Sequence, residues 1–307
     1  MTSPSRSIAG LTAVAAGIAI AISGASSPAT AAAPAHDAAV PRALTTVAPT
    51  KVLTVLEENH SLTQMQTGMP YLASLAAKYS YASDWTAVSH PSLPNYLAIV
   101  GGSTFGVSND SAPSVNAAKV GSAMSVFDQA IAAGKTAKTY AESMPSNCAL
   151  ATSGTYAVKH NPWAYFGSSS TRANCNSFDA STATLQTAES TNTLPNAGLV
   201  VPNLANDAHN GTLATADSWL RTNLAKALAS TDFTSGRLVV VVTCDEGTST
   251  YPNDKVLTVV MHAGTAHRVV STLLSHYSLT RYYAQVLGST PLAAGAKAPD
   301  MKSAFGL

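Results

Sequence analysis

The sequence predicts an α/β fold, a three-layer sandwich in which helices cover both faces of a mostly parallel central sheet. Short apolar runs rich in β-branched residues alternate with helical patterns along the chain. These runs are nearly continuous in hydrophobicity, as expected of strands that are buried on both faces. With 307 residues, of which 46% are hydrophobic and 11% charged, the chain is long enough to bury a large core.

Five strands are predicted, each bounded by turn residues. They are Lys51–Leu56, Lys138–Ala141, Gly198–Val201, Arg237–Thr243 and Val256–His262. Apolar residues at helical spacing predict five helices between and after them. These are Tyr71–Lys78, Asn95–Val100, Ser125–Ala133, Ala216–Ala229 and Leu279–Leu287. Residues 145–197 are rich in Ser, Thr and Asn and weakly periodic, which is typical of a segment that is functional or held by a bridge.

The N-terminal sequence predicts export. Arg6 precedes an apolar run, Ile8–Ile22, and Ala29-Thr30-Ala31 fits a small-x-small cleavage site. We expect a signal peptide over 1–31, a flexible Ala/Pro-rich lead-in over 32–48 and a catalytic domain over 49–307. A membrane anchor is the alternative, but the run is short and weakly hydrophobic. The prediction is a secreted protein without stable membrane insertion.

Charge and cysteines narrow the function classes. A net charge of +1 and the lack of a basic run argue against binding to nucleic acid. Cys148 and Cys175 both lie in polar, loop-like sequence, so we expect them to form a disulfide, which export permits. Cys244 follows an apolar strand and is expected to be a buried free thiol. The spacing of the three cysteines does not fit a zinc site.

Polar residues cluster after three of the predicted strands. The clusters are Glu57–His60, Pro202–His209 and Cys244–Gly247, and both adjacent acidic pairs of the sequence fall within them. Parallel sheets bind ligands beyond the carboxyl ends of their strands. Carboxylates, amides and imidazoles that converge there are typical of a divalent-metal site, although each cluster alone reads as a solvated turn.

The segment Ser89–Tyr96 contains a candidate nucleophile. Two prolines make a stiff loop ahead of a helix expected to begin near Asn95, which places Ser92 close to the helix N-terminus. Free N–H groups there favour an anion, and a nearby metal ion can activate a serine hydroxyl for attack on phosphorus. The alternative is an ordinary loop in which Ser92 caps the helix.

Eight motifs in order carry a family resemblance. They are LEENHS (56–61), SHPSLPNYLAIVGG (89–102), YAESMPSNC (140–148), KHNPWAYF (159–166), VPNLANDAHNG (201–211), DSWL (217–220), CDEG (244–247) and HYSLTRYYAQVLG (276–288). The chain resembles the bacterial phosphoesterase family of secreted acid phosphatases and phospholipases C, within the alkaline phosphatase superfamily. Its length is similar to that of the compact acid phosphatases, among them phosphatidylinositol 3-phosphatases. The resemblance implies an alkaline-phosphatase-like fold.

The resemblance also implies roles for residues of this chain. Ser92 matches the nucleophile, with His160 and His209 as further catalytic residues and Lys159 and Asn95 as substrate-binding residues. The implied metal ligands are Glu58, Asn59, Asp245 and Glu246, with Asp207 and His276 as candidates for a second ion. Two positions depart from the family pattern: Cys244 stands where Trp is common, and Asn210 replaces an Asp. Glu246 follows the family pattern, although the wider superfamily has His at that position.

The expected activity is that of a phosphoric ester hydrolase. We predict a secreted, metal-dependent phosphomonoesterase that works through a phosphoserine, with phosphate esters, including phosphoinositides, as substrates. The cofactor is a divalent ion, Mg, Mn, Ca or Zn, and the oxygen-rich ligand set favours the first three. The alternatives are a phospholipase C-type phosphodiesterase and a non-catalytic protein that binds phosphate or a phospholipid headgroup.

Overall fold

The computed structural model describes residues 47–249 and 253–307. The predicted signal peptide (1–31) and nearly all of the predicted lead-in (32–48) lie outside these ranges. Within them the chain builds an eight-stranded sheet in the order β5-β4-β6-β1-β7-β8-β2-β9 and a two-stranded ribbon, β10-β3. The strands are β1 (Lys51–Glu57), β2 (Ser80–Ala82), β3 (Trp85–Thr86), β4 (Ala137–Ala141), β5 (Asp179–Ser181), β6 (Ala197–Val201), β7 (Leu238–Cys244), β8 (Thr258–Met261), β9 (Arg268–Val270) and β10 (Leu274–Ser275).

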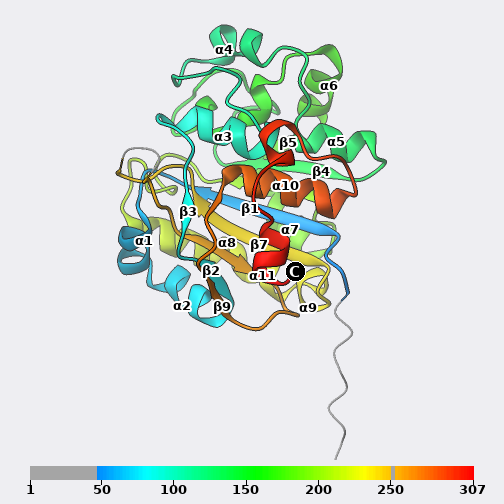
Figure 1. The fold of residues 1–307 in the computed structure, drawn as a ribbon. Helices are drawn as coiled ribbons and strands as arrows, with labels where there is room; N and C mark the ends of the chain where they lie inside the picture. Colours follow the sequence, from blue (N-terminus) through cyan, green and yellow to red (C-terminus); the bar gives the residue numbers. More distant parts are fainter. Residues whose placement is uncertain (1–46, 250–252) are drawn as a thin grey trace, which may run out of the picture. The chain divides into compact units, whose positions relative to one another are not determined.

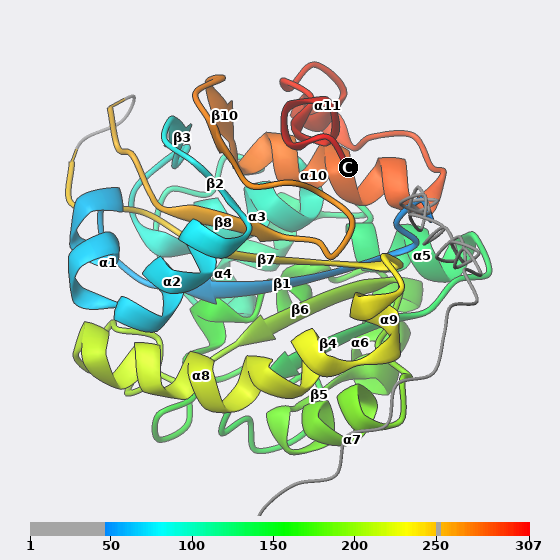
Figure 2. The same ribbon diagram turned by 90° about the horizontal axis from the view of Figure 1, so that it is seen from below.

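Helices cover both faces of the large sheet (Figures 1 and 2). One face carries α3 (Ser92–Gly101), α5 (Val126–Ala132) and α10 (His276–Leu287). The other carries α2 (Pro70–Lys78), α7 (Leu185–Ser190), α8 (Leu213–Ala229) and α9 (Thr231–Thr234). The remaining α-helices are α1 (Leu62–Gly68), α4 (Pro113–Val120), α6 (Ser169–Phe178) and α11 (Met301–Phe305). Short 3-10 turns, η1 (Val158–His160), η2 (Pro162–Tyr165), η3 (Thr182–Thr184) and η4 (Ala293–Ala296), complete the elements.

The predicted fold class is confirmed, and the central strands explain why. Every residue of β7 is buried, and six of the seven in β1 are, because helices cover both sides. β5, β4, β6, β1 and β7 pair in parallel. β8 runs antiparallel to both neighbours, β7 and β2. The described residues between β7 and β8 contain no helix, as is usual for a connection between antiparallel strands.

All five predicted strands are present as β1, β4, β6, β7 and β8, with bounds that differ by one or two residues. The five predicted helices are present as α2, α3, α5, α8 and α10. Three of them, α3, α8 and α10, begin three residues earlier than predicted, so each predicted range omits the first helical turn. The strands that were not predicted have only two or three residues, too few for a readable period.

The segment 145–197 is more ordered than its composition predicts. It holds η1, η2, α6, β5, η3 and α7, and a disulfide links Cys148 to Cys175, as predicted. The free cysteine Cys244 is buried, also as predicted. Because η1 lies between the two bridged cysteines, the disulfide closes the loop that presents Lys159 and His160.

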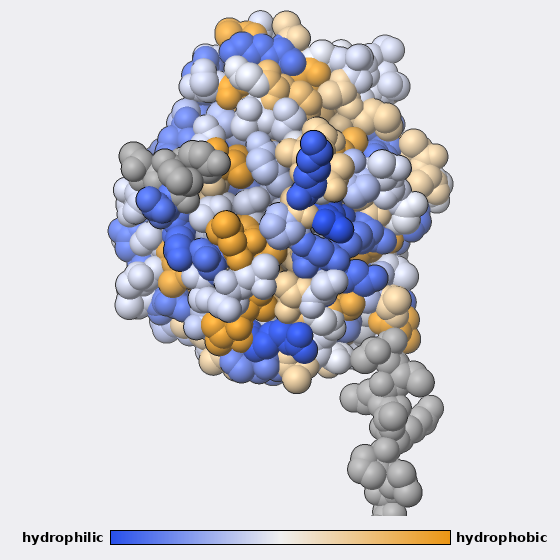
Figure 3. Space-filling view, in the orientation of Figure 1, coloured by the Kyte–Doolittle hydropathy of each residue, from blue (hydrophilic) through white to orange (hydrophobic). Residues whose placement is uncertain are grey.

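The surface in the orientation of Figure 3 mixes polar and apolar side chains, and the apolar ones form separate small patches. Among the described residues, no helix is both long and apolar enough to cross a membrane.

Replacing both bridged cysteines, Cys148→Ser with Cys175→Ser, should lower the free energy of unfolding by about 3 to 4 kcal/mol, the loop-entropy value for a bridge of this span. Activity should fall as well, since the loop presents Lys159 and His160. Chemical denaturation and a phosphatase assay measure the two effects. A reducing agent should affect wild type but not the double variant. An unchanged denaturation midpoint would contradict the assigned role of the bridge.

Candidate active site

The carboxyl ends of β1 and β7 meet at one edge of the sheet. Glu57 pairs with Cys244 in the β1–β7 register, so the residues that follow, Glu58 and Asp245, leave the sheet side by side. Main-chain bonds hold them there: the Asp245 N–H donates to Glu57 O at 3.0 Å, and the Asn59 N–H donates to Asp245 Oδ1 at 3.1 Å. The predicted convergence of the strand exits therefore has a direct geometric basis.

The β6 exit joins the same cluster. The Glu58 N–H donates to Asp207 O at 2.8 Å, which fixes the loop after β6 against the end of β1. Asp207 in turn accepts from the N–H of His209 through Oδ1 at 2.8 Å. One edge of the sheet thus brings together the acidic residues of all three predicted clusters.

Ser92 is the first residue of α3, and its hydroxyl points at Glu58. Ser92 Oγ donates to Glu58 Oε2 at 3.1 Å, and both residues are buried. One helical turn later, the Tyr96 hydroxyl donates to the other Glu58 oxygen. The Ser92–Tyr96 spacing of four residues puts both side chains on one face of the helix, toward the carboxylate.

His160 lies between two buried carboxylates. Its Nε2 is 3.1 Å from Glu58 Oε1 and its Nδ1 is 3.1 Å from Asp207 Oδ2, distances of ion pairs whose angles fall short of aligned hydrogen bonds. Burial alone would lower the pKa of His160, but the two carboxylates outweigh it and raise the pKa to about 9. Burial would raise the pKa of Glu58, but His160 outweighs it and the pKa is lowered. Both side chains are therefore charged at neutral pH.

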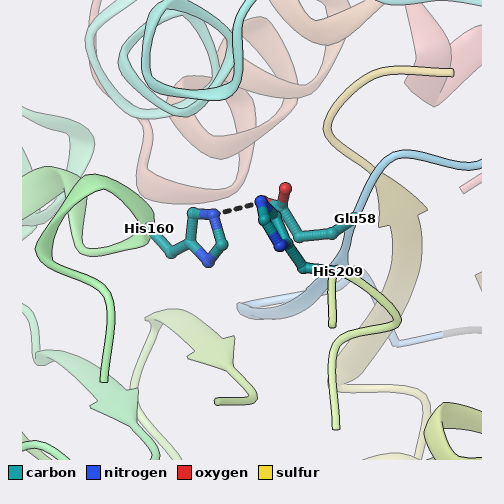
Figure 4. Close-up of side chains that lie close together, drawn as sticks. All are labelled: Glu58, His160 and His209. Carbon is teal, nitrogen blue, oxygen red and sulfur yellow. Dashed lines mark ion pairs between the residues drawn. The ribbon is translucent and has the colours of Figure 1, made fainter. Parts of the chain in front are cut away.

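Lys159 brings a second positive charge to Ser92. Its Nζ lies 3.4 Å from Ser92 Oγ, 2.9 Å from Asp110 Oδ2 and 3.3 Å from His209 Nε2. Because an ammonium only donates, His209 Nε2 accepts, and its proton sits on Nδ1, which faces Asn210 Oδ1 at 2.8 Å. His209, His160 and Glu58 form one group whose ligand atoms lie within 4.8 Å of one another (Figure 4).

Asp245 and Glu246, the carboxylates that follow β7, are not fully balanced by positive charge from nearby side chains. Asp245 is fully buried, and its Oδ2 has no hydrogen-bond partner among the described residues. Burial, reinforced by Glu58 and Glu246, raises the pKa of Asp245 well above its usual value. Burial likewise raises the pKa of Glu246 to about 7, although His90 opposes the shift. A divalent cation would offset these charges, so the donor set of Glu58, Asp245 and Glu246 fits one.

Two residues that the resemblance assigns to the substrate and to a metal ion, Asn95 and His276, make internal hydrogen bonds in this structure. Asn95 is fully buried and holds the preceding loop: its Oδ1 accepts from the N–H of Val88 and Ser89, and its Nδ2 donates to Ser89 O and Glu246 Oε2. It therefore supports the site from behind rather than facing a substrate.

His276 is the second of these residues. Its Nδ1 accepts from Trp85 Nε1 at 3.2 Å and its Nε2 faces the main-chain oxygen of Asp245, so neither ring nitrogen is left for a metal ion. Burial lowers the pKa of His276 to about 4, which keeps the ring neutral. This histidine braces the end of β7 from the interior.

Four residues of the site were not predicted from the sequence. Tyr96 lies in the motif at 89–102, and its helical spacing of four residues from Ser92 is a signal that could have identified it. His90, in the same motif, lies with Nδ1 3.1 Å from Glu246 Oε2 and Nε2 3.1 Å from Asp254 Oδ2. Asp254 is fully buried and Asp110 contacts Lys159, but both come from loops without any sequence pattern.

Comparison with known proteins identifies the family. The model of the phosphoesterase family matches residues 52–294. The chain belongs to the phosphoesterase family. As a member it is a phosphoric ester hydrolase, and the predicted family and enzyme class are confirmed.

Two relatives show which phosphoesterases this chain is similar to in sequence. The phosphatidylinositol-3-phosphatase of Mycobacterium tuberculosis is 30% identical over 258 residues, which cover 83% of this chain and 82% of that protein. The phosphate-repressible acid phosphatase of Penicillium chrysogenum is 32% identical over 219 residues, 68% of this chain but only 52% of that protein, so this chain spans about half its length.

The solved structures match in fold. A protein of the alkaline phosphatase superfamily from Vibrio parahaemolyticus has a TM-score of 0.55 at 12% identity, covering 81% of this chain and 70% of that chain. The lipoteichoic acid synthase LtaP from Listeria monocytogenes has a TM-score of 0.55 at 10% identity, covering 82% and 77%. At these identities the likeness concerns the fold alone, and it supports the alkaline-phosphatase-like architecture.

The buried neutral ring of His276 predicts an acid-sensitive fold. The pKa is about 4 when folded and about 6.5 when unfolded, so the unfolded state gains the proton first as pH falls. The contribution of the neutral ring is complete above pH about 6.5 and declines by about 3 kcal/mol toward pH 4.

Denaturation of wild type and His276→Gln from pH 7 to 4, with chelator present, measures this effect. The stability advantage of wild type should shrink as pH falls, because glutamine does not titrate. Two stability curves that stay parallel over this range would contradict the assignment.

Proposed function

We propose that this phosphoesterase is a metal-dependent phosphomonoesterase that uses Ser92 as its nucleophile. One observation carries the proposal: Ser92 Oγ, at the first position of α3, lies between the Glu58 carboxylate at 3.1 Å and the Lys159 ammonium at 3.4 Å. Its hydroxyl proton is directed at a carboxylate, and its lone pair faces a cation. This is the environment that activates a hydroxyl for attack.

In the proposed reaction, Ser92 Oγ attacks phosphorus in line, the bond from phosphorus to the ester oxygen breaks, and the alcohol departs. Lys159 and the N-terminus of α3 face the negative charge of the phosphoryl group. The proton of the Ser92 hydroxyl passes to Glu58, and a proton from His160 accompanies the leaving oxygen. Water then attacks the phosphoserine, releasing phosphate and restoring the hydroxyl.

Glu58, Asp245 and Glu246 would hold a divalent ion, and Asp207, whose carboxylate contacts His160, is the proposed ligand of a second one. When bound, such an ion lowers the pKa of a hydroxyl group and stabilises charge on phosphoryl oxygens. The fully buried Oδ2 of Asp245, which has no hydrogen-bond partner in the described part of the chain, supports this role.

For the substrate we propose phosphate monoesters that include phosphoinositides. The support is the similarity to the mycobacterial phosphatidylinositol-3-phosphatase, which extends over 82% of that protein. We also propose export, supported by the pattern of Arg6, the apolar run 8–22 and the small residues at 29–31, and by the disulfide, which an oxidising compartment permits.

Ser92→Ala should lower turnover of p-nitrophenyl phosphate and phosphatidylinositol 3-phosphate by at least about 1000-fold, because no other hydroxyl is so placed in the site described above. Ser89→Ala is the matched control, since that hydroxyl donates to the neighbouring main-chain oxygen of His90 and, within residues 47–249 and 253–307, to no catalytic candidate. Mass spectrometry after an acid quench should find phosphate on Ser92. Near-normal turnover by Ser92→Ala would exclude the nucleophile assignment, and phosphatidylcholine cleavage at a higher rate would favour the phosphodiesterase alternative.

Chelation should abolish hydrolysis, and one of Mg, Mn, Ca or Zn should restore it on add-back. Asp245→Asn should lose bound metal, measured by elemental analysis and by calorimetric titration of the ion, because it removes a buried carboxylate oxygen that finds no hydrogen-bond partner among the described residues. Asp84→Asn, which removes a carboxylate paired with Lys255, should bind metal as wild type does. Full activity after exhaustive chelation would rule out metal dependence.

A further inference from the structure

Asp110 links Lys159 to α3, the helix that begins with Ser92. It lies in the segment between α3 and α4, and its two carboxylate oxygens have different partners. Oδ1 accepts from the main-chain N–H of Leu93 at 3.0 Å, and Oδ2 accepts from Lys159 Nζ at 2.9 Å. Both side chains are mostly buried, with 28% of Asp110 and 19% of Lys159 exposed.

The anchor of Asp110 on α3 is rigid. The residue before the helix, Pro91, offers no side-chain cap, so the N–H of Leu93, the second helical residue, is satisfied from outside by Asp110. This N–H belongs to the residue immediately after the nucleophile. The carboxylate therefore keeps a fixed position relative to Ser92.

Lys159 depends on such an anchor for its position. A lysine side chain is long and flexible, and without a partner its ammonium samples many positions. Among the contacts of the ammonium described above, the contact with Asp110 is the shortest, at 2.9 Å, and its partner is a carboxylate. Ser92 Oγ lies at 3.4 Å and His209 Nε2 at 3.3 Å. The opposite charge of Asp110 thus holds the ammonium where it meets both Ser92 and His209.

We propose that Asp110 is a positioning residue for phosphoryl transfer, which acts through Lys159 by holding its ammonium beside Ser92 Oγ. The inference rests on the proposed function, in which Ser92 is the nucleophile. The competing role is a helix cap for α3 that has no effect on Lys159.

A double-mutant cycle separates these roles. Asp110→Asn keeps an oxygen that can accept from the Leu93 N–H but removes the charge that holds Lys159. Introduced into the otherwise unchanged protein, it should lower kcat/KM for p-nitrophenyl phosphate by about 100-fold. In a Lys159→Met background the same substitution should change kcat/KM by less than about twofold, because no ammonium remains to be placed. Asp110→Ser, which is also neutral and also able to cap, should behave likewise.

Controls distinguish the possible failures. Asp84→Asn breaks another 2.9 Å Asp–Lys pair and should leave kcat/KM within about twofold of wild type. An Asp110→Asn effect of equal size in both backgrounds, no effect in wild type, or loss of the folded state in both Asp110 variants would overturn the inference. Ser92→Ala, assayed in parallel, tests the foundation: if it is active, the proposed function fails too; if it is inactive, a failed cycle overturns the role of Asp110 alone.

Discussion

The buried carboxylate of Glu58 is the point on which the site depends. It leaves the end of β1, at the centre of the sheet, with no exposure to water. An ionised carboxylate in such a place is stable only when hydrogen bonds and opposite charge replace its solvation. The structure supplies Ser92, Tyr96 and His160, which reach Glu58 from α3 and from η1. The positions of α3, of the η1 loop and of Ser92 are thus all tied to one charge.

The remaining charge balance explains why the site needs more than side chains. Glu58 has His160 and Lys159 nearby, but Asp245 is buried against other carboxylates, with its pKa raised by that burial and by those neighbours. A parallel sheet brings its strand exits together, and with them any acidic residues that follow the strands. Such a fold concentrates negative charge at one edge of the sheet. A cation bound there would balance the buried carboxylates and would also attract a phosphate group.

The central fold could be predicted because its strands are long and buried on both faces. β1 and β7 each have seven residues, and their continuous hydrophobicity is readable without knowledge of their partners. β2, β9 and β10 have two or three residues and form only because neighbouring segments pair with them. The antiparallel direction of β8 followed from a loop connection, which hydrophobic pattern does not encode.

The site was predictable where chemistry coincides with a strand exit or a motif. Glu58, Asp245 and Asp207 follow strands, so the topology of the sheet alone brings them together. Asn95 and His276 lie in motifs too, yet both are spent on internal hydrogen bonds, because a motif records that a residue type is needed and not whether it faces a ligand. Only packing distinguishes these two cases.

In the irregular segment 145–197, hydrogen bonds to the sheet fix the positions of loop residues as firmly as those of strand residues. Lys159 and His160 come from a short 3-10 turn with little stability of its own. The next residue, Asn161, donates to Asp179 Oδ2 at 2.6 Å, and Thr139 of β4 donates to Oδ1 at 2.6 Å. Asp179 begins β5, so the turn is bonded to the sheet while the disulfide closes the loop around it. Lys159 and His160 are therefore positioned by the same sheet that positions Glu58, through bonds that no local sequence pattern reveals.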